Sequence, residues 1–253
     1  MKKYTVLSAL AFTCLTLQAA ELAGVRYGGY TTNAVPQGFS ILAVPFSGFD
    51  TNSFTTTDLS LNDLISTNGL AIGDRLIAFN EATTNYYYYA LTSGGWSPLS
   101  VAQIETESTN FVVVVNNPPD LATVLKAQGY AFWLRTQSAT TAYLQGVVDE
   151  KETSVDIASN SWTLVGNALP SPLNLGSPTF TDANTWFTPY SPVTGPGDEI
   201  HVVVNGSNYQ QNVFFNGSWK LLENGQPTTP STIPAGSGVW FYRRGTNVTF
   251  KLQ

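Results

Sequence analysis

The chain has 253 residues, of which 13% are aromatic and only 11% are charged, and its formal net charge is −6. It contains no basic run, which argues against binding to nucleic acid or to an anionic membrane surface. The single cysteine, Cys14, lies in a segment that we expect to be removed on export, so neither disulfides nor thiolate metal sites are expected in the mature chain. We expect no metal or other cofactor.

Residues 1–20 have the pattern of a secretory signal peptide. Lys2 and Lys3 form a basic start, Val6 to Leu17 is a short apolar stretch, and small residues precede Glu21. This pattern predicts export to the periplasm, the cell surface or the medium of a bacterium. No later apolar run is long enough to cross a bilayer as a helix, so no transmembrane segment is expected after signal removal.

The rest of the chain carries one pattern twice. The four landmarks of the first copy and their counterparts are Phe39 and Trp162, Gly73 and Gly197, Trp96 and Trp219, and Gly129 and Gly236. The first three pairs are shifted by 123 or 124 positions and the last by 107, so the first copy holds a 16-residue insertion before Gly129. A repeat of this length indicates a duplicated domain or half-domain, because solenoid repeats span about 20–50 residues.

In chain order, the first copy reads as short strands joined by polar turns. The expected strands are Tyr30–Val35, Phe39–Phe46, Leu76–Phe79, Tyr86–Leu91, Phe111–Val115, Tyr130–Arg135 and Tyr143–Val148. The first two should pair as an opening hairpin, and the third and fourth as a longer one. Asp120 is expected to cap a short helix over Leu121–Lys126.

The second copy repeats this order. Its expected strands are Thr153–Ile157, Trp162–Gly166, Val202–Val204, Val213–Phe215, Val239–Arg243 and Val248–Leu252. We therefore predict an all-β fold of two tandem, internally duplicated antiparallel β-sandwich or barrel-like modules, residues 21–148 and 149–253, with the charged run Asp149–Glu152 at the boundary. A single pseudo-symmetric body in which the halves share one core is the alternative.

Three of these runs resemble known bacterial modules. Tyr30 to Phe46 resembles the opening of an uncharacterised secreted protein family found mainly in Verrucomicrobia-type bacteria. Trp162 to Pro172 resembles the G-W-N-L-I-G-N-P-Y-P-S-P run of bacterial surface-protein modules, with Ala168-Leu169 in place of Pro-Tyr, and Ile233 to Trp240 is similar to their I-x-A-G-x-G-F-W closure. The resemblance implies an exported β-module without an established activity, and it therefore transfers no catalytic residue.

Few residues are of types that carry chemistry. His201 is the only histidine, which favours a solvated strand side chain over a triad or zinc ligand. Asp74 and Asp198 each follow a glycine at a strand entrance, where a carboxylate caps backbone N–H groups, and this structural role is favoured over acid–base chemistry. Asp149–Glu152 is interpreted as a solvated linker, with a weak calcium site as the alternative.

Aromatic residues give the clearest candidates for ligand binding. On an extended strand Tyr86 and Tyr88 share one face, and Tyr87 and Tyr89 share the other. A tyrosine ring combines a flat apolar face with a hydroxyl group, which suits the recognition of sugars. The alternative is that these four side chains only support cross-strand packing.

Four tryptophans recur in register in the two copies and are interpreted as core anchors: Trp96, Trp133, Trp219 and Trp240. With the signal, the duplication and the scarcity of catalytic residue types, they indicate an exported, non-enzymatic cell-envelope or surface protein with a structural or adhesive role. The alternative is a carbohydrate-binding module that uses exposed aromatic residues. The partners would be an extracellular glycan or other envelope proteins. A hydrolase that uses carboxylates is a third hypothesis.

Overall fold

The computed structural model describes residues 28–50, 55–80, 83–99, 118–147, 153–169, 171–176, 187–195, 197–205 and 208–252. Antiparallel strands dominate these residues, which confirms the predicted all-β class. No helix among them is long and apolar enough to cross a membrane. The expected signal peptide, the strand Phe111–Val115 and the boundary run Asp149–Glu152 lie outside this part of the chain.

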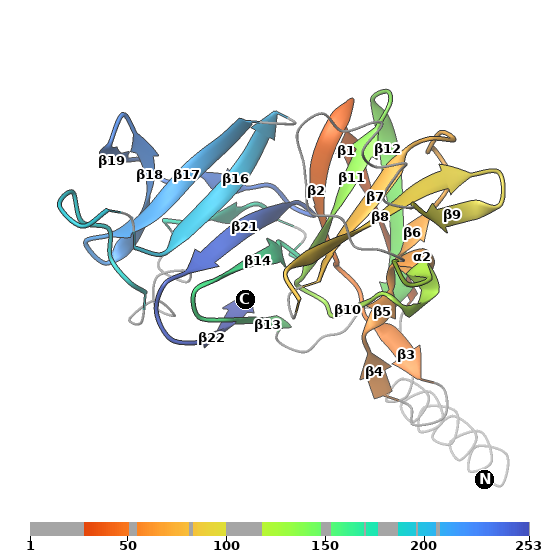
Figure 1. The fold of residues 1–253 in the computed structure, drawn as a ribbon, viewed down its shortest axis with the longest axis horizontal. Helices are drawn as coiled ribbons and strands as arrows, with labels where there is room; N and C mark the ends of the chain where they lie inside the picture. The colour runs from red at the N-terminus through yellow and green to blue at the C-terminus, as the bar shows by residue number, and fades with distance from the viewer. Residues whose placement is uncertain are drawn as a thin grey trace, which may run out of the picture.

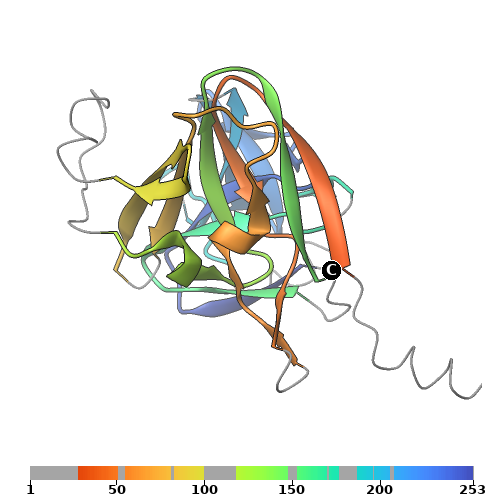
Figure 2. The same cartoon turned by 90° about the vertical axis from the view of Figure 1, so that its right-hand side faces the viewer.

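The first half of the chain forms a five-stranded antiparallel sheet, on the right in Figure 1. Its strands, from edge to edge, are β2 (Gly38–Ala43), β11 (Ala131–Thr136), β7 (Arg75–Asn80), β8 (Asn85–Thr92) and β9 (Gly95–Pro98). The hairpin of β7 and β8 is the predicted one. A smaller sheet contains β1 (Gly28–Val35), β12 (Thr140–Val147) and β6 (Ile65–Ser66), and Figure 2 views the molecule from that side.

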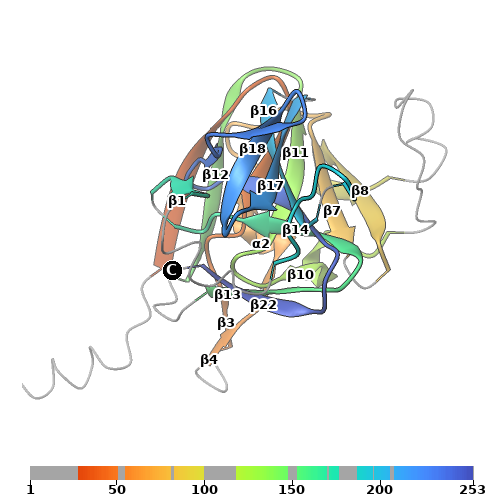
Figure 3. The same ribbon diagram turned by 90° about the vertical axis from the view of Figure 1, so that its left-hand side faces the viewer.

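The second half forms a six-stranded sheet, on the left in Figure 1. Its strands are β14 (Ser161–Gly166), β21 (Gly238–Arg243), β16 (Glu199–Asn205), β17 (Asn208–Phe215), β18 (Ser218–Glu223) and β19 (Gln226–Thr228). β16 and β17 form the predicted hairpin. The terminal strands β13 (Thr153–Ile157) and β22 (Val248–Leu252) pair beside this sheet, as Figure 3 shows.

The first five positions of the two large sheets follow the same plan. In each sheet the second strand of that half, β2 or β14, lies at one edge, and the second-to-last strand, β11 or β21, lies beside it. The long hairpin follows, and then the next strand of the chain. The order β2-β11-β7-β8-β9 thus parallels β14-β21-β16-β17-β18.

The two predicted opening hairpins are wrong, although their strands form. β1 pairs with β12 rather than with β2, and β2 pairs with β11. In the second half, β13 pairs with β22 and β14 with β21. The short turn at Pro36–Gly38 therefore carries the chain from one sheet to another, and Gly38 takes a positive φ of 99° there.

The remaining elements are short. They are β3 (Gly48–Asp50), β4 (Thr55–Thr57), β5 (Leu59–Ser60), α2 (Leu61–Leu64), the 3₁₀ turn η1 (Leu121–Thr123), β10 (Leu125–Lys126), β15 (Leu173–Asn174) and β20 (Thr232–Ile233). Asp120 caps η1 by accepting from the backbone N–H of Ala122 at 2.9 Å, as predicted. The expected helix is shorter than predicted because the chain after Thr123 pairs with β5.

Each half has its own core between its large sheet and its smaller one. In the first half, Leu42 and Phe132 of the large sheet pack with Leu144 of β12. In the second half, Val165 and Phe241 pack with Val155 of β13. Each half is therefore a layered β-structure around an apolar interior.

A third core joins the halves, and we call it the interface cluster. Its buried residues are Ile41, Ile77, Phe79, Ala131, Trp133, Leu164 and Trp240. The first five come from the first sheet and the last two from the second. The ring of Phe79 lies 5.0 Å from that of Trp240, centroid to centroid. The large sheets thus face each other across apolar side chains from both halves.

Backbone contacts bring the two edges of this interface close together. The N–H of Ala43 donates to the carbonyl of Gly236 at 2.8 Å, and the N–H of Gly166 donates to the carbonyl of Gly129 at 2.7 Å. A Cβ on Gly166 would lie 2.4 Å from the carbonyl oxygen of Tyr130, so this approach requires glycine.

Candidate functional site

The four candidate tyrosines alternate between the two faces of β8, as the strand period predicts. Tyr89 is fully buried in the core of the first half, and its hydroxyl donates to the carbonyl of Pro119 at 2.8 Å. Tyr87 packs half-buried against the same core, and its hydroxyl accepts from Asn80 Nδ2 at 3.0 Å. Tyr89 therefore offers no surface to a ligand.

Tyr86 and Tyr88 lie on the opposite face and pack against the interface cluster. The Tyr86 ring is 5.1 Å from Phe79 and 6.2 Å from Trp240. Burial raises the pKa of Tyr86 to about 12, and the neighbouring Tyr88 and Tyr209 phenols add to the shift. Both faces of β8 are thus covered, and a ligand-binding role for Tyr86, Tyr87 and Tyr88 stays a prediction restricted to their exposed parts.

Asp74 and Asp198 are both buried at strand entrances and both bind backbone N–H groups. Asp74 accepts from Ala71 and Gln137, each at 2.9 Å. Asp198 accepts from Thr188 at 2.9 Å and from Arg244 at 2.6 Å. The favoured structural interpretation of these carboxylates is confirmed by these contacts.

Asp198 also forms a buried ion pair that Asp74 does not share. Its Oδ2 accepts from Nη1 of Arg243, and both side chains are 2% exposed or less. The Nε of Arg243 donates to the carbonyl of Thr246 at 2.8 Å. A buried charge of this kind is maintained by its partners, because removing one leaves the other without compensation.

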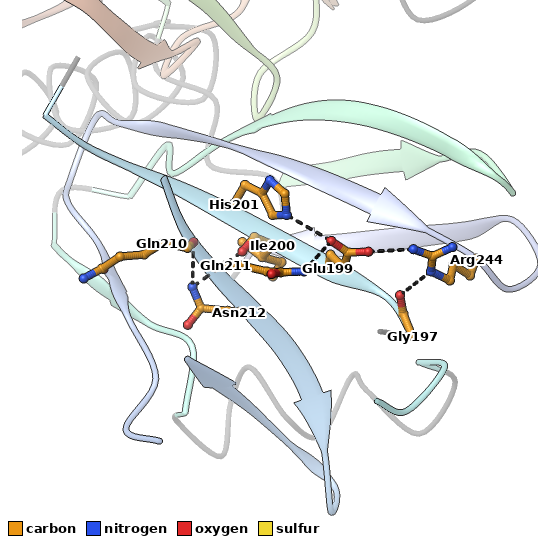
Figure 4. A network of polar contacts seen from close by, with 8 residues as sticks. All are labelled: Gly197, Glu199, Ile200, His201, Gln210, Gln211, Asn212 and Arg244. Carbon is orange, nitrogen blue, oxygen red and sulfur yellow. Dashed lines mark hydrogen bonds and ion pairs between the residues drawn. The ribbon is translucent and has the colours of Figure 1, made fainter. Parts of the chain in front are cut away.

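His201 is not the isolated solvated side chain that the sequence predicted. Its Nε2 lies 3.0 Å from Oε2 of Glu199, which also accepts from Nε2 of Gln211 at 2.8 Å. The other carboxylate oxygen of Glu199 accepts from Nη2 of Arg244 at 2.7 Å. Figure 4 shows Glu199 between these partners, with Arg244 also donating through Nε to the carbonyl of Gly197.

This network lies on one face of the second sheet, among aromatic rings. Glu199 is directly opposite Tyr242 on β21, which is opposite Trp162 on β14. The Trp162 ring is 4.8 Å from His201 and 4.8 Å from Tyr242, and Tyr209 is 6.1 Å from His201. We call this group the Glu199 surface: Trp162, Glu199, His201, Tyr209, Gln211, Tyr242 and Arg244.

The Glu199 surface combines a buried charge with accessible groups. The Glu199 side chain is 8% exposed, whereas His201 is 25% and Arg244 41% exposed. Burial alone would raise the pKa of Glu199, but the hydrogen bonds from His201, Arg244 and Gln211 outweigh it and place the pKa below the ordinary value of 4.5. Glu199 is therefore an ionised anchor that orients its neighbours.

Sequence reasoning missed this surface apart from His201. One signal was present, because Glu199 and His201 are two residues apart on a strand and so share a face. The positions of Trp162, Tyr242 and Arg244 depend on strand pairing over long separations in the chain.

Three of the four tryptophans are buried, but only Trp219 lies in the core of its own half. Trp219 is fully buried, and Trp133 and Trp240 are 7% and 8% exposed. Trp96 is only partly buried against the core of the first half. Trp133 and Trp240 anchor the interface between the halves rather than the core of either half.

Within the described residues, no three His, Cys, Asp or Glu side chains gather as a metal site would require. The calcium alternative at Asp149–Glu152 falls outside these residues. A scan against protein-family models found no match to this chain, and neither did searches of curated proteins and of solved structures.

Proposed function

We propose that this chain is an exported, non-enzymatic protein of a bacterial cell envelope or surface with a structural or adhesive role, built from two copies of one β-module. The shared strand order of the two large sheets supports the duplication. Each copy would be a small antiparallel sandwich, since each core lies between a large sheet and a smaller one.

The reciprocal contacts at the interface support the duplication in this proposal. The bond from Ala43 to Gly236 has a counterpart in the bond from Gly166 to Gly129. The repeat shift of 123 relates residue 43 to residue 166, and the shift of 107 relates residue 129 to residue 236. The isolated bridges 42–237 and 130–165 obey the same exchange. Such reciprocity is typical of a two-fold interface between identical units.

The buried carboxylates fit a structural role. Gln137 and Arg244, whose N–H groups bind Asp74 and Asp198, are also related by the shift of 107. Asp74 thus links the loop before β7 to the residue after β11, and Asp198 links the loop before β16 to the residue after β21. Carboxylates committed to such contacts support a rigid body that displays surfaces over a hydrolase that uses Asp198.

Cell fractionation tests this proposal. The mature chain should begin at Glu21 and should be found in the envelope, on the surface or in the medium. Protease treatment of intact cells should remove a surface-exposed form, and deletion of the gene should weaken attachment or envelope integrity. A full-length chain confined to the cytosol would contradict the proposal.

Carbohydrate binding is a second candidate function, and the partly exposed Glu199 surface favours it. Aromatic rings that carry hydroxyl groups stand there beside fixed polar side chains, a combination suited to sugars. Retention on polysaccharide affinity gels tests this function. The double variant Tyr86→Ala with Tyr88→Ala tests whether the tyrosines identified from the sequence contribute: a fall in retention while the protein stays folded would assign them to the site, and unchanged retention would exclude them.

A further inference from the structure

We infer that the Glu199 surface is the binding site of this protein for a neutral saccharide. This inference rests on the carbohydrate-binding function proposed above. It places the site on the second sheet rather than on the tyrosine run of β8.

The aromatic side chains supply flat apolar faces that water reaches. Tyr209 is 44% exposed, and Trp162 and Tyr242 are half-buried at its side of the sheet. The Trp162 and Tyr242 rings contact each other at a tilt of 49°, so they form a bent platform rather than a stacked pair. The C–H faces of a sugar ring pack on such platforms, and the sugar hydroxyls remain free to bind polar groups.

The polar side chains are held in place before any ligand arrives. Glu199 accepts from His201, Gln211 and Arg244, and these contacts fix the rotamers of all three. Within the described residues, no hydrogen bond engages His201 Nδ1, Gln211 Oε1 or the hydroxyls of Tyr209 and Tyr242. These groups are left to donate to and accept from sugar hydroxyls.

The charge of the surface favours an uncharged ligand. Arg244 pairs with Glu199 at 2.7 Å and also lies 4.8 Å from the Tyr242 ring centroid. The negative charge of the Glu199 carboxylate and the positive charge of the Arg244 guanidinium cancel, so the surface offers no net charge to a ligand. The chain itself carries a net charge of −6, which repels polyanions such as uronic-acid polymers.

The matching face of the first sheet lacks these features. Ile77 and Tyr88 occupy the positions that the repeat shift relates to His201 and Gln211, and both pack into the interface. Arg75 stands at the position of Glu199 and faces Arg135 directly across the sheet. The polar groups of the saccharide site therefore belong to the second half alone, whereas Trp162 also packs against the interface cluster, next to the first half.

Affinity gel electrophoresis with hydroxyethyl cellulose, soluble xylan and laminarin as neutral probes, and alginate as the anionic one, tests the inference. Wild-type protein should be retarded by at least one neutral polymer and not by alginate. Tyr209→Ala should weaken that interaction about tenfold through loss of an exposed ring, and Tyr209→Phe should show how much the hydroxyl contributes. Gln211→Ala should weaken it as well.

Tyr30→Ala is the matched control, because Tyr30 is 78% exposed and lies on β1, in a different sheet from the strands that carry the Glu199 surface. It should leave retardation unchanged, and near-ultraviolet circular dichroism should show that every variant is folded. If no neutral polymer retards the wild type, the carbohydrate-binding function itself fails. If a neutral polymer retards the wild type and Tyr209→Ala leaves that retardation unchanged, the function stands but this site is wrong. Stronger retardation by alginate would also overturn the inference.

Discussion

The facing surfaces of the two large sheets differ at positions that the proposed duplication makes equivalent. In the first sheet, Ile77 belongs to the interface cluster, and Tyr88, directly opposite it, packs against that cluster. In the second sheet, His201 and Gln211 are directly opposite each other and both bind Glu199. The backbone register is the same, but one pair extends an apolar contact and the other builds a polar surface.

The strand-entrance aspartates show a second difference. Asp74 binds only backbone N–H groups, whereas Asp198 performs the same task and also pairs with Arg243. At the position that the repeat shift relates to Arg243, the first half has Thr136, whose hydroxyl donates to the carbonyl of Pro36 at 2.9 Å. The contacts with backbone N–H groups thus account for an aspartate in both halves, whereas the last residue of β11 and β21 differs between them.

Trp219→Ala should have the largest effect on stability. Trp219 is fully buried against the rings of Phe187, Phe214 and Phe241, and truncating a buried tryptophan typically costs about 3–5 kcal/mol. Equilibrium unfolding in urea measures this loss. Trp96→Ala is the matched variant and should cost clearly less, because Trp96 is only partly buried. Equal losses would show that the two tryptophans are equivalent anchors.

The shape of that unfolding curve tests whether the halves behave as one body. The interface cluster contains residues from both sheets, so Trp219→Ala should shift a single transition that involves the whole described fold. Fluorescence and far-ultraviolet circular dichroism should coincide. Two separate transitions, of which only one moves, would show that the halves unfold independently.

Asp198→Asn should come next, with a loss of about 3 kcal/mol in the free energy of unfolding. The substitution removes the carboxylate charge beside the buried guanidinium of Arg243 while keeping an acceptor of similar shape. Asp74→Asn has no ion pair to lose and should cost about 1 kcal/mol. Chemical denaturation of both variants at neutral pH gives the comparison, and a larger loss for Asp74→Asn would contradict it.

Gly166→Ala should cost about 1–3 kcal/mol, because its new Cβ would overlap the Tyr130 carbonyl at the backbone crossing between the halves. Gly94→Ala is the control. Its nearest neighbour to a new Cβ is 3.9 Å away, so its effect should stay within about 0.5 kcal/mol. Thermal unfolding compares the two variants. An unchanged melting temperature for Gly166→Ala would mean that the backbones at Gly166 and Tyr130 are not in close contact.

Glu199→Gln should have the smallest effect, seen as a change in pH dependence. The pKa of Glu199 is lowered on folding, so its contribution is complete above its unfolded value of 4.5 and is lost as the pH falls toward the folded value. The variant should therefore lose less stability than wild type between neutral pH and acid below 4.5. The exposed Glu223→Gln is the control, and denaturation at several pH values checks both.

Much of the local structure could be predicted from the sequence. Alternating and β-branched runs marked both long hairpins, and Asp120 marked a cap that forms as predicted. The roles of Asp74 and Asp198 followed from glycine and aspartate at strand entrances. These features depend on backbone geometry over a few residues, which the local sequence specifies.

Only the tertiary structure decided which strands are neighbours and which side chains remain accessible. β1 looked like the partner of β2 because a short turn joins them, yet it pairs with β12 across about a hundred residues. The same long-range pairing buries Tyr89, covers Tyr86, and brings Trp162 and Arg244 to Glu199. The period of a strand gives its two faces but not what covers them, because burial depends on segments far away in the chain.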